Sequence, residues 1–227
     1  MKWTKQQIAT VISVSFHIAG FIGIGLLQLP FYLLFIPVNL FLSAALIFFT
    51  QEKINAPFIL FFLAAIGIGF GAEWLGIHTG LLFGDFTFGT AMGPQWQGVP
   101  YTIGIQWFVV LYSSGICMAM LHEKLLQNQL PGSKGVPAFW VWVSMVADGT
   151  LLALFLDWVM EPVAMHLGLW AWEGGEVPGL NYATWWGTGA LIMVFFQLLP
   201  FHRRNLFAVH LLMIQVMFFL LLRLVLL

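Results

Sequence analysis

The stretch APFILFFLAAIGIGFGAEWL, residues 56–75, indicates the fold class. It is almost entirely apolar, and Glu73 is its only charged residue. A run of about 20 predominantly apolar residues is long enough to cross the hydrocarbon core of a bilayer as a helix. Comparable runs lie on both sides of this one, and turn-forming residues separate them. The sequence predicts an all-α, polytopic membrane bundle of about seven transmembrane helices, over residues 7–27, 31–50, 56–75, 101–121, 137–160, 183–200 and 206–226.

The composition agrees with a membrane protein. Hydrophobic residues make up 61% of the 227 residues and charged residues 7%, whereas charged residues are about 25% of an ordinary soluble domain. The net charge of −1 offers no basic surface, so no nucleic-acid partner is expected. The single cysteine, Cys117, excludes an intrachain disulfide and a cysteine-based zinc site. We expect one integral-membrane domain, residues 1–227, in contact with the lipid bilayer; the sequence does not define an oligomeric state.

Lysine and arginine predict the orientation of this bundle. With seven crossings, only Arg223 falls on the side away from the N-terminus. The other seven fall on the N-terminal side: Lys2, Lys5, Lys53, Lys124, Lys134, Arg203 and Arg204. Because cytoplasmic loops are enriched in Lys and Arg, the N-terminus is expected to be cytoplasmic, in the cytoplasmic (inner) membrane. The two long loops, about residues 76–100 and 161–182, then lie on the outer side.

The acidic residues show the opposite bias. Glu73, Asp85, Asp157, Glu161, Glu173 and Glu176 gather at the outer helix ends or in the two outer loops. Asp157 and Glu161 are four residues apart, so they are neighbours on one helix face. Two carboxylates so close to the bilayer core cannot both ionise cheaply, and one is expected to keep its proton as a donor beside a carboxylate that acts as a base. The alternative is a structural pair at the point where Glu161-Pro162 leaves the membrane.

An offset of 88 residues indicates an internal repeat. EWLGIHTGLLFGD (73–85) then lies on EPVAMHLGLWAWE (161–173), which matches Glu73 with Glu161, His78 with His166, and Asp85 with Glu173. Both copies run in the same direction, so the repeat is expected to be parallel, relating the third and fourth helices to the fifth and sixth. The repeat units are about residues 56–121 and 137–200. Chance similarity between two glycine- and tryptophan-rich loops is the alternative.

Eight of the eleven tryptophans lie near the outer side: Trp74, Trp96, Trp107, Trp158, Trp170, Trp172, Trp185 and Trp186. They are typical of an interfacial belt, or of a cavity whose aromatic faces hold a carbocation. No two histidines lie within four residues of each other, so the histidine clusters of di-iron oxygenases are absent. No phosphate-binding or nucleophile-elbow motif occurs, and we expect neither a metal nor a cofactor. The spacing Gly67-x-x-x-Gly71 predicts a helix-packing face.

These residues resemble a known family. GIHTGLLFGDFTFGTAMGPQWQGVP (76–100), followed by Trp107, is similar to the first signature of the membrane carotenoid hydratases of the CruF type, which include γ-carotene and bisanhydrobacterioruberin hydratases. The second signature is matched by Asp157, Glu161-Pro162, Trp170, Trp172, Val177-Pro178, Asn181 and Trp185. Three departures occur: Glu161 replaces a usual Asp, Phe86 and Phe88 replace common tyrosines, and Glu176 replaces a usual Gly.

The resemblance implies the addition of water to the terminal 1,2 double bond of an acyclic (ψ) carotenoid end, such as lycopene, γ-carotene or a bisanhydrobacterioruberin-like substrate. General acid–base catalysis through a tertiary carbocation fits the acids found above. The expected catalytic residues are Glu73, Asp85, Asp157 and Glu161. The expected orienting and substrate-binding residues are His78, His166, Asn181, Trp107, Trp170, Trp172 and Trp185. Two alternatives stay open: a carotenoid cyclase that starts with the same protonation, and a non-enzymatic carotenoid- or lipid-binding protein.

Overall fold

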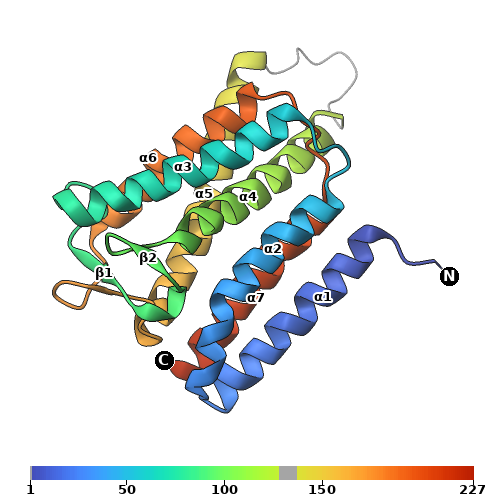
Figure 1. Ribbon diagram of the computed structural model, residues 1–227. Coiled ribbons are helices and arrows are strands. Elements are labelled where there is room, and N and C mark those ends of the chain that lie inside the picture. The colour runs from blue at the N-terminus through green and yellow to red at the C-terminus, as the bar shows by residue number, and fades with distance from the viewer. Residues whose placement is uncertain (1, 128–136) are drawn as a thin grey trace.

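The computed structural model describes residues 2–127 and 137–227, and its described part is a bundle of seven α-helices (Figure 1). The predicted all-α class is confirmed. Lys134, which the orientation argument includes, lies outside the described residues. The helices are α1 (Lys5–Gly20), α2 (Ile36–Thr50), α3 (Ala56–Thr79), α4 (Tyr101–Gln127), α5 (Ala138–His166), α6 (Gly179–Leu198) and α7 (Leu206–Leu226).

Shorter elements complete the chain. The π-helix η1 (Phe21–Leu26) extends α1, and the 3-10 helix η2 (Pro30–Phe35) leads into α2. Between α3 and α4 lie β1 (Phe86–Phe88), the 3-10 helix η3 (Thr90–Met92), β2 (Gln95–Trp96) and β3 (Val99–Pro100). The last strand, β4 (Trp170–Trp172), lies between α5 and α6.

In the described part of the chain, six helical segments are long and apolar enough to cross a membrane. They are Lys5–Leu26, Pro30–Thr50, Ala56–Thr79, Tyr101–Leu125, Ala138–His166 and Leu206–Leu226. The prediction named seven spans, and the sixth of them is a helix, α6, that does not meet this criterion although it is 20 residues long. The reason is its polar first half, which contains Asn181, Tyr182 and Thr184. Two of these side chains serve the site described below.

The helix ends follow from local sequence. Asn55 caps α3, since its side chain accepts a hydrogen bond from the backbone N–H of Phe58, as Asn commonly does at this position. The helix stops at Gly80, which has a left-handed φ of 65° that costs glycine little. Beyond the end of α5, Gly168 has nearly the same φ, 64°. A glycine in the left-handed conformation therefore follows each of the two helices, α3 and α5, that carry the candidate acids.

Helix α4 is the centre of the bundle. It packs against α2, α3, α5, α6 and α7, and 72% of its most apolar 18-residue window is buried, against 22–33% for the other five spanning segments. Its contact with α3 depends on Gly69, where an added Cβ would lie 2.3 Å from the Trp107 ring. Gly67 and Gly71 face open space instead. The predicted Gly67-x-x-x-Gly71 packing face is therefore wrong, because Gly69 faces the neighbouring helix.

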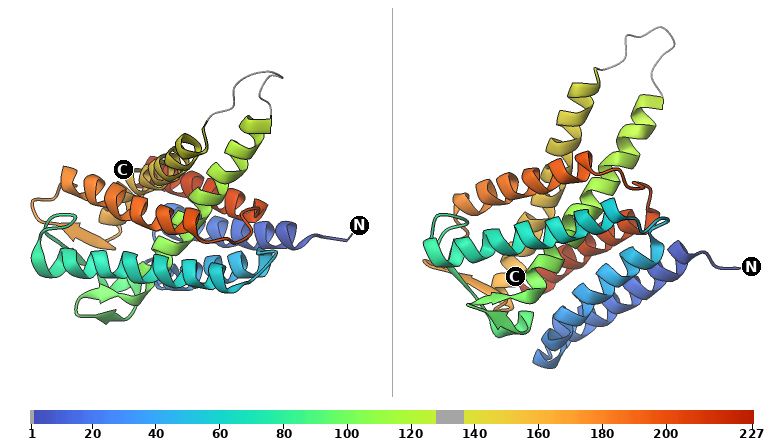
Figure 2. Two further views of the ribbon diagram at one scale, coloured as in Figure 1. Left: turned by 90° about the horizontal axis from the view of Figure 1, so that it is seen from above. Right: turned by 45° about the horizontal axis from the view of Figure 1, so that its top comes forward.

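The two ends of the bundle differ in character. At one end, Arg204 pairs with Glu123, and the Gln51 side chain donates to the carbonyl oxygen of His202. At the other, β1 pairs with β4 in antiparallel register, with Phe86 opposite Trp172 and Phe88 opposite Trp170. We call this second end the strand end; Figures 1 and 2 show it beside the starts of α4 and α6. The ladder joins the two long loops that the sequence predicts on one side.

Candidate active site

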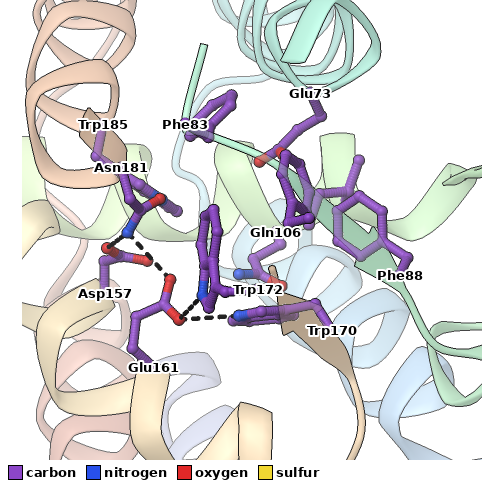
Figure 3. Close-up of a pocket in the computed structure, with 12 residues that line it drawn as sticks. Glu73, Phe83, Phe88, Gln106, Asp157, Glu161, Trp170, Trp172, Asn181 and Trp185 are labelled. Atoms are coloured by element: carbon purple, nitrogen blue, oxygen red, sulfur yellow. Dashed lines mark hydrogen bonds between the residues drawn. The ribbon is translucent and has the colours of Figure 1, made fainter. Parts of the chain in front are cut away.

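A small pocket lies at the strand end, among α3, α4, α5, α6 and the β1–β4 ladder (Figure 3). Three carboxylates, Glu73, Asp157 and Glu161, line it, and their residues are 5%, 1% and 2% exposed. The rest of the lining is aromatic, apolar or amide: Phe83, Phe86, Phe88, Ile103, Gln106, Trp170, Trp172, Asn181 and Trp185. Buried acids beside aromatic rings form an environment suited to proton transfer onto an apolar molecule.

Helix spacing and strand alternation together position the groups around Glu161. Asp157 and Glu161 lie one turn apart on α5, so both side chains point to the same face. In β4, alternate residues point to the same side, which places Trp170 and Trp172 together while Ala171 is exposed. Both indole N–H groups donate to Oε2 of Glu161, over 2.9 and 3.1 Å.

Asn181 links the two α5 acids. Its amide nitrogen donates to Oδ2 of Asp157 over 3.3 Å and to Oε1 of Glu161 over 3.1 Å (Figure 3). Glu161 thus accepts three N–H hydrogen bonds, an arrangement that stabilises a carboxylate anion. Asp157 accepts one, and its buried Oδ1 has no hydrogen-bond partner among the described residues. A buried polar atom without a partner is costly, so Oδ1 is the atom of this pair that is free to hold a proton and meet a ligand.

Glu73 approaches from the opposite wall. Its Oε1 accepts a hydrogen bond from the Trp107 indole over 3.0 Å. The Trp107 ring in turn stacks on Trp185, with ring centroids 3.9 Å apart and an interplanar angle of 19°. This chain of contacts connects α3, α4 and α6 and orients the Glu73 carboxylate. Trp107 therefore supports the pocket from behind, while Trp185 lines it.

Phe83 reaches the pocket through an unusual backbone conformation. Its φ is 65°, in the left-handed region that a bulky residue seldom adopts. The residue is 1% exposed, and its N–H donates to the Thr184 hydroxyl over 3.0 Å. Such strain persists only where the surroundings hold it and often marks a functional site. Here it turns an aromatic ring toward the acids, as Figure 3 shows.

Four of the expected site residues do not line the pocket: Trp107, which binds Glu73 from behind it, and Asp85, His78 and His166. Asp85 is exposed, and its carbonyl oxygen accepts from the backbone N–H of Glu173 over 2.9 Å. His78 is exposed and stacks on Trp74, with ring centroids 4.5 Å apart. His166, in the last turn of α5, is exposed as well. His78 and His166 each follow a buried acid by five residues on the same helix, a spacing that places them about 140° around the helix from that acid. Asp85 lies beyond the end of α3.

The pocket also contains residues that sequence reasoning did not select. Gln106 is 6% exposed, and among the described residues the partner of its amide nitrogen is the Met160 sulfur, at 3.7 Å. The sequence could have indicated Gln106, because burial of an amide in the apolar run 101–121 is costly unless the amide has a partner or a function. No comparable sequence feature indicated Phe83. Phe86 and Phe88 were noticed only as departures from the family pattern, and both line the pocket.

Matched positions of the predicted repeat meet at this site. Glu73 and Glu161 line the same pocket, and each accepts an indole N–H. Trp107 and Trp185, which VPYTIGIQW (99–107) and VPGLNYATW (177–185) place in matching positions after a ten-residue deletion, stack on each other. These contacts agree with a parallel repeat about an axis through the site. The superposition of the two complete repeat units stays a prediction.

Comparisons with known proteins indicate the family to which the chain is related. Residues 31–227 match the model of a family described as carotenoid biosynthesis protein. Over 132 residues the chain is 28% identical to the bisanhydrobacterioruberin hydratase of Haloarcula japonica, an alignment that covers 56% of this chain. The chain spans 41% of the length of that relative. No solved structure matches the chain.

Proposed function

The chain belongs to the carotenoid biosynthesis protein family, and from this premise we propose that it is a hydratase that adds water to the terminal double bond of an acyclic carotenoid end group. The observation that carries the proposal is the buried set of three carboxylates facing aromatic rings in one pocket. The similarity to a hydratase supports the same reaction class. The product is a tertiary alcohol.

Asp157 is the proposed proton donor. A terminal alkene has no polar atom to which the protein could hydrogen-bond. The acid must therefore donate to the π-bond a proton that is not held in a hydrogen bond to another protein group. Asp157 lines the pocket, and its Oδ1 has no hydrogen-bond partner among the described residues, whereas both oxygens of Glu161 accept hydrogen bonds. The proton adds to the less substituted carbon of the double bond, and the electron pair of the π-bond forms the new C–H bond. A tertiary cation remains on the other carbon.

Aromatic faces and carboxylates stabilise this cation. Phe86 packs against Trp172, with ring centroids 5.0 Å apart, and Phe88 lies edge-on to Trp170 at 6.3 Å. A cation over such faces gains about 0.5–2 kcal/mol from each favourable contact. The Glu161 anion adds an attraction in a water-poor pocket, where charge interactions are stronger than in bulk water.

Water completes the reaction. An oxygen lone pair of water attacks the tertiary carbon, and the proton released passes to a carboxylate, for which Glu161 is the proposed base. The Gln106 amide is suited to orient that water, since only a sulfur atom occupies its nitrogen. One proton enters carbon and one leaves water, so the acid–base pair ends with the same proton count and no cofactor takes part.

Isotope labelling tests the proposal directly. The purified protein would be incubated with lycopene in H₂¹⁸O and, separately, in D₂O, and the products would be analysed by mass spectrometry. We expect ¹⁸O in the new hydroxyl group and deuterium on the adjacent carbon. A product of unchanged mass in H₂¹⁸O but with deuterium on carbon would identify a cyclase instead. Hydroxyl oxygen that comes from O₂ would contradict the hydratase mechanism.

A further inference from the structure

A second and larger cavity lies beside the acid pocket, in the same half of the bundle. It has a volume of about 380 Å³ and is bounded by α1, η1, η2, α2, α4, α5 and α7. Ligand sites commonly have volumes of about 300–1,000 Å³, so this space is large enough to hold a substantial part of an apolar molecule. Most of its lining is apolar. The imidazole of His17, which lies in it, already contacts the backbone oxygen of Ser13 at 2.8 Å.

The two cavities share part of their walls. Gln106 and Trp170 line both of them, so one molecule could extend past these two side chains from one space into the other. Val110 follows Gln106 by four residues on α4, and it lines only the larger cavity. Because residues four apart share a helix face, Val110 lies next to Gln106 on the same wall, on the side of the larger cavity.

Part of the lining of the larger cavity is exposed at the surface of the bundle, and we call this part its rim. Phe31 and Phe16 line it and are 63% and 38% exposed, and Ala19 beside them is exposed as well. Near this rim α1 becomes the π-helix η1, within which Gly23 lies against the Tyr32 ring; a Cβ there would be 2.3 Å away. Single π-turns in helices are frequent at functional sites. Phe16 and Ala19 lie within the apolar segment Lys5–Leu26, and Phe31 lies within Pro30–Thr50, so the rim is formed by segments that are apolar enough to contact lipid.

We propose that the larger cavity binds the polyene chain of the substrate, which enters from the bilayer between α1 and η2 and presents its end group to the acids past Gln106 and Trp170. This inference rests on the proposed function, because it takes the occupant to be a long carotenoid. Its basis is the wall that the two cavities share, the volume of the larger one and its apolar lining. Burial of the chain in this cavity makes binding depend on the length of the hydrocarbon.

Pigment binding by variants that fill the cavity tests the inference without requiring turnover. Val110→Phe fills the wall next to the junction, and Ala19→Trp fills the rim, where no core side chain has to move because Ala19 is exposed. Ile18→Trp is the matched control, since Ile18 is exposed on the same helix and does not line the cavity. Lycopene binding to each purified protein would be titrated by its absorbance and induced circular dichroism, after size-exclusion chromatography has established folding.

We expect the wild type and Ile18→Trp to bind lycopene alike, and each filled variant that folds to bind it at least about tenfold more weakly. Wild-type affinity in the filled variants would overturn the inference, and so would a wild type that does not bind lycopene. Loss of bound phospholipid from the filled variants with unchanged lycopene affinity would assign the cavity to bilayer acyl chains and overturn it too. A wild type that binds lycopene and returns it unchanged would refute the hydratase while leaving the subsite intact.

Discussion

Asp157 and Glu161 lie one turn apart on α5 and accept hydrogen bonds from the same amide nitrogen, that of Asn181 (Figure 3). Their surroundings then differ. Two indole N–H groups donate to Glu161, whereas Oδ1 of Asp157 has no partner in the described part of the chain. This asymmetry distinguishes a proton donor from a base in a pair of similar acids.

Neutralising either member of the pair should stop the reaction. Asp157→Asn removes the proposed proton donor, and Glu161→Gln removes the proposed base. Each is expected to lower turnover by at least about 10²-fold, the usual scale for the loss of a general acid or base. Turnover of lycopene would be measured by product chromatography. Glu173→Gln is the control, because Glu173 is exposed in the loop; near-wild-type turnover in both pocket variants would remove the pair from the mechanism.

Asp85 should matter far less than Glu73. The Asp85 side chain is exposed outside the pocket, whereas Glu73 lines it. Asp85→Asn is expected to keep turnover within about twofold of wild type, as an exposed substitution usually does. Glu73→Gln keeps an oxygen that can accept the Trp107 N–H but loses the charge, and is expected to lower turnover at least about tenfold. Equal losses in the two variants, assayed side by side, would return Asp85 to the catalytic set.

Gln106→Leu should change which product forms. The variant keeps all three carboxylates, so protonation of the alkene continues, but the amide that is proposed to orient water is lost. The cation should then lose a proton more often and return an alkene whose double bond has moved. The measurement is the ratio of alcohol to isomerised carotenoid, followed in D₂O so that each protonation leaves a label. An unchanged ratio would show that Gln106 does not orient the water.

Two glycines on one helix should respond oppositely to alanine. In Gly69→Ala the new methyl group would meet the Trp107 ring, and overpacking of this kind costs about 1–3 kcal/mol. Gly67→Ala meets nothing within 4 Å and should raise stability slightly, because alanine favours a helix over glycine by about 1 kcal/mol. Thermal unfolding in detergent would compare the two. Equal melting temperatures would contradict the close contact between α3 and α4.

The orientation in the membrane can be tested by labelling single cysteines in a Cys117→Ala background. Lys53 and Gln95 are both exposed; Lys53 lies in the α2–α3 loop, and Gln95 lies at the strand end. From the positive-inside rule we expect Lys53→Cys to react with a membrane-impermeant reagent only from the cytoplasmic side. Gln95→Cys should react only from outside. Labelling of both from the same side of intact cells would contradict the proposed topology.

The sequence by itself determined the helical class, the positions of the helices and the Asp157–Glu161 pair. All three depend on local information: apolar run length, turn residues between runs, and a spacing of four along one helix. The family signatures placed Trp170, Trp172 and Asn181 in the site for the same reason, because the motif residues follow one another within one helix–strand–helix segment.

Only the tertiary structure decided which acids share a pocket. Glu73 and Asp85 are twelve residues apart and looked equivalent in sequence, yet one lies inside and the other outside. The difference arises from the left-handed turn at Gly80 and the pairing of β1 with β4, which depend on contacts between loops far apart in the chain. The roles of Gln106 and Phe83, and the second cavity, have the same origin. A cavity is the space between helices, so it depends on how they pack and has no signature in any single segment.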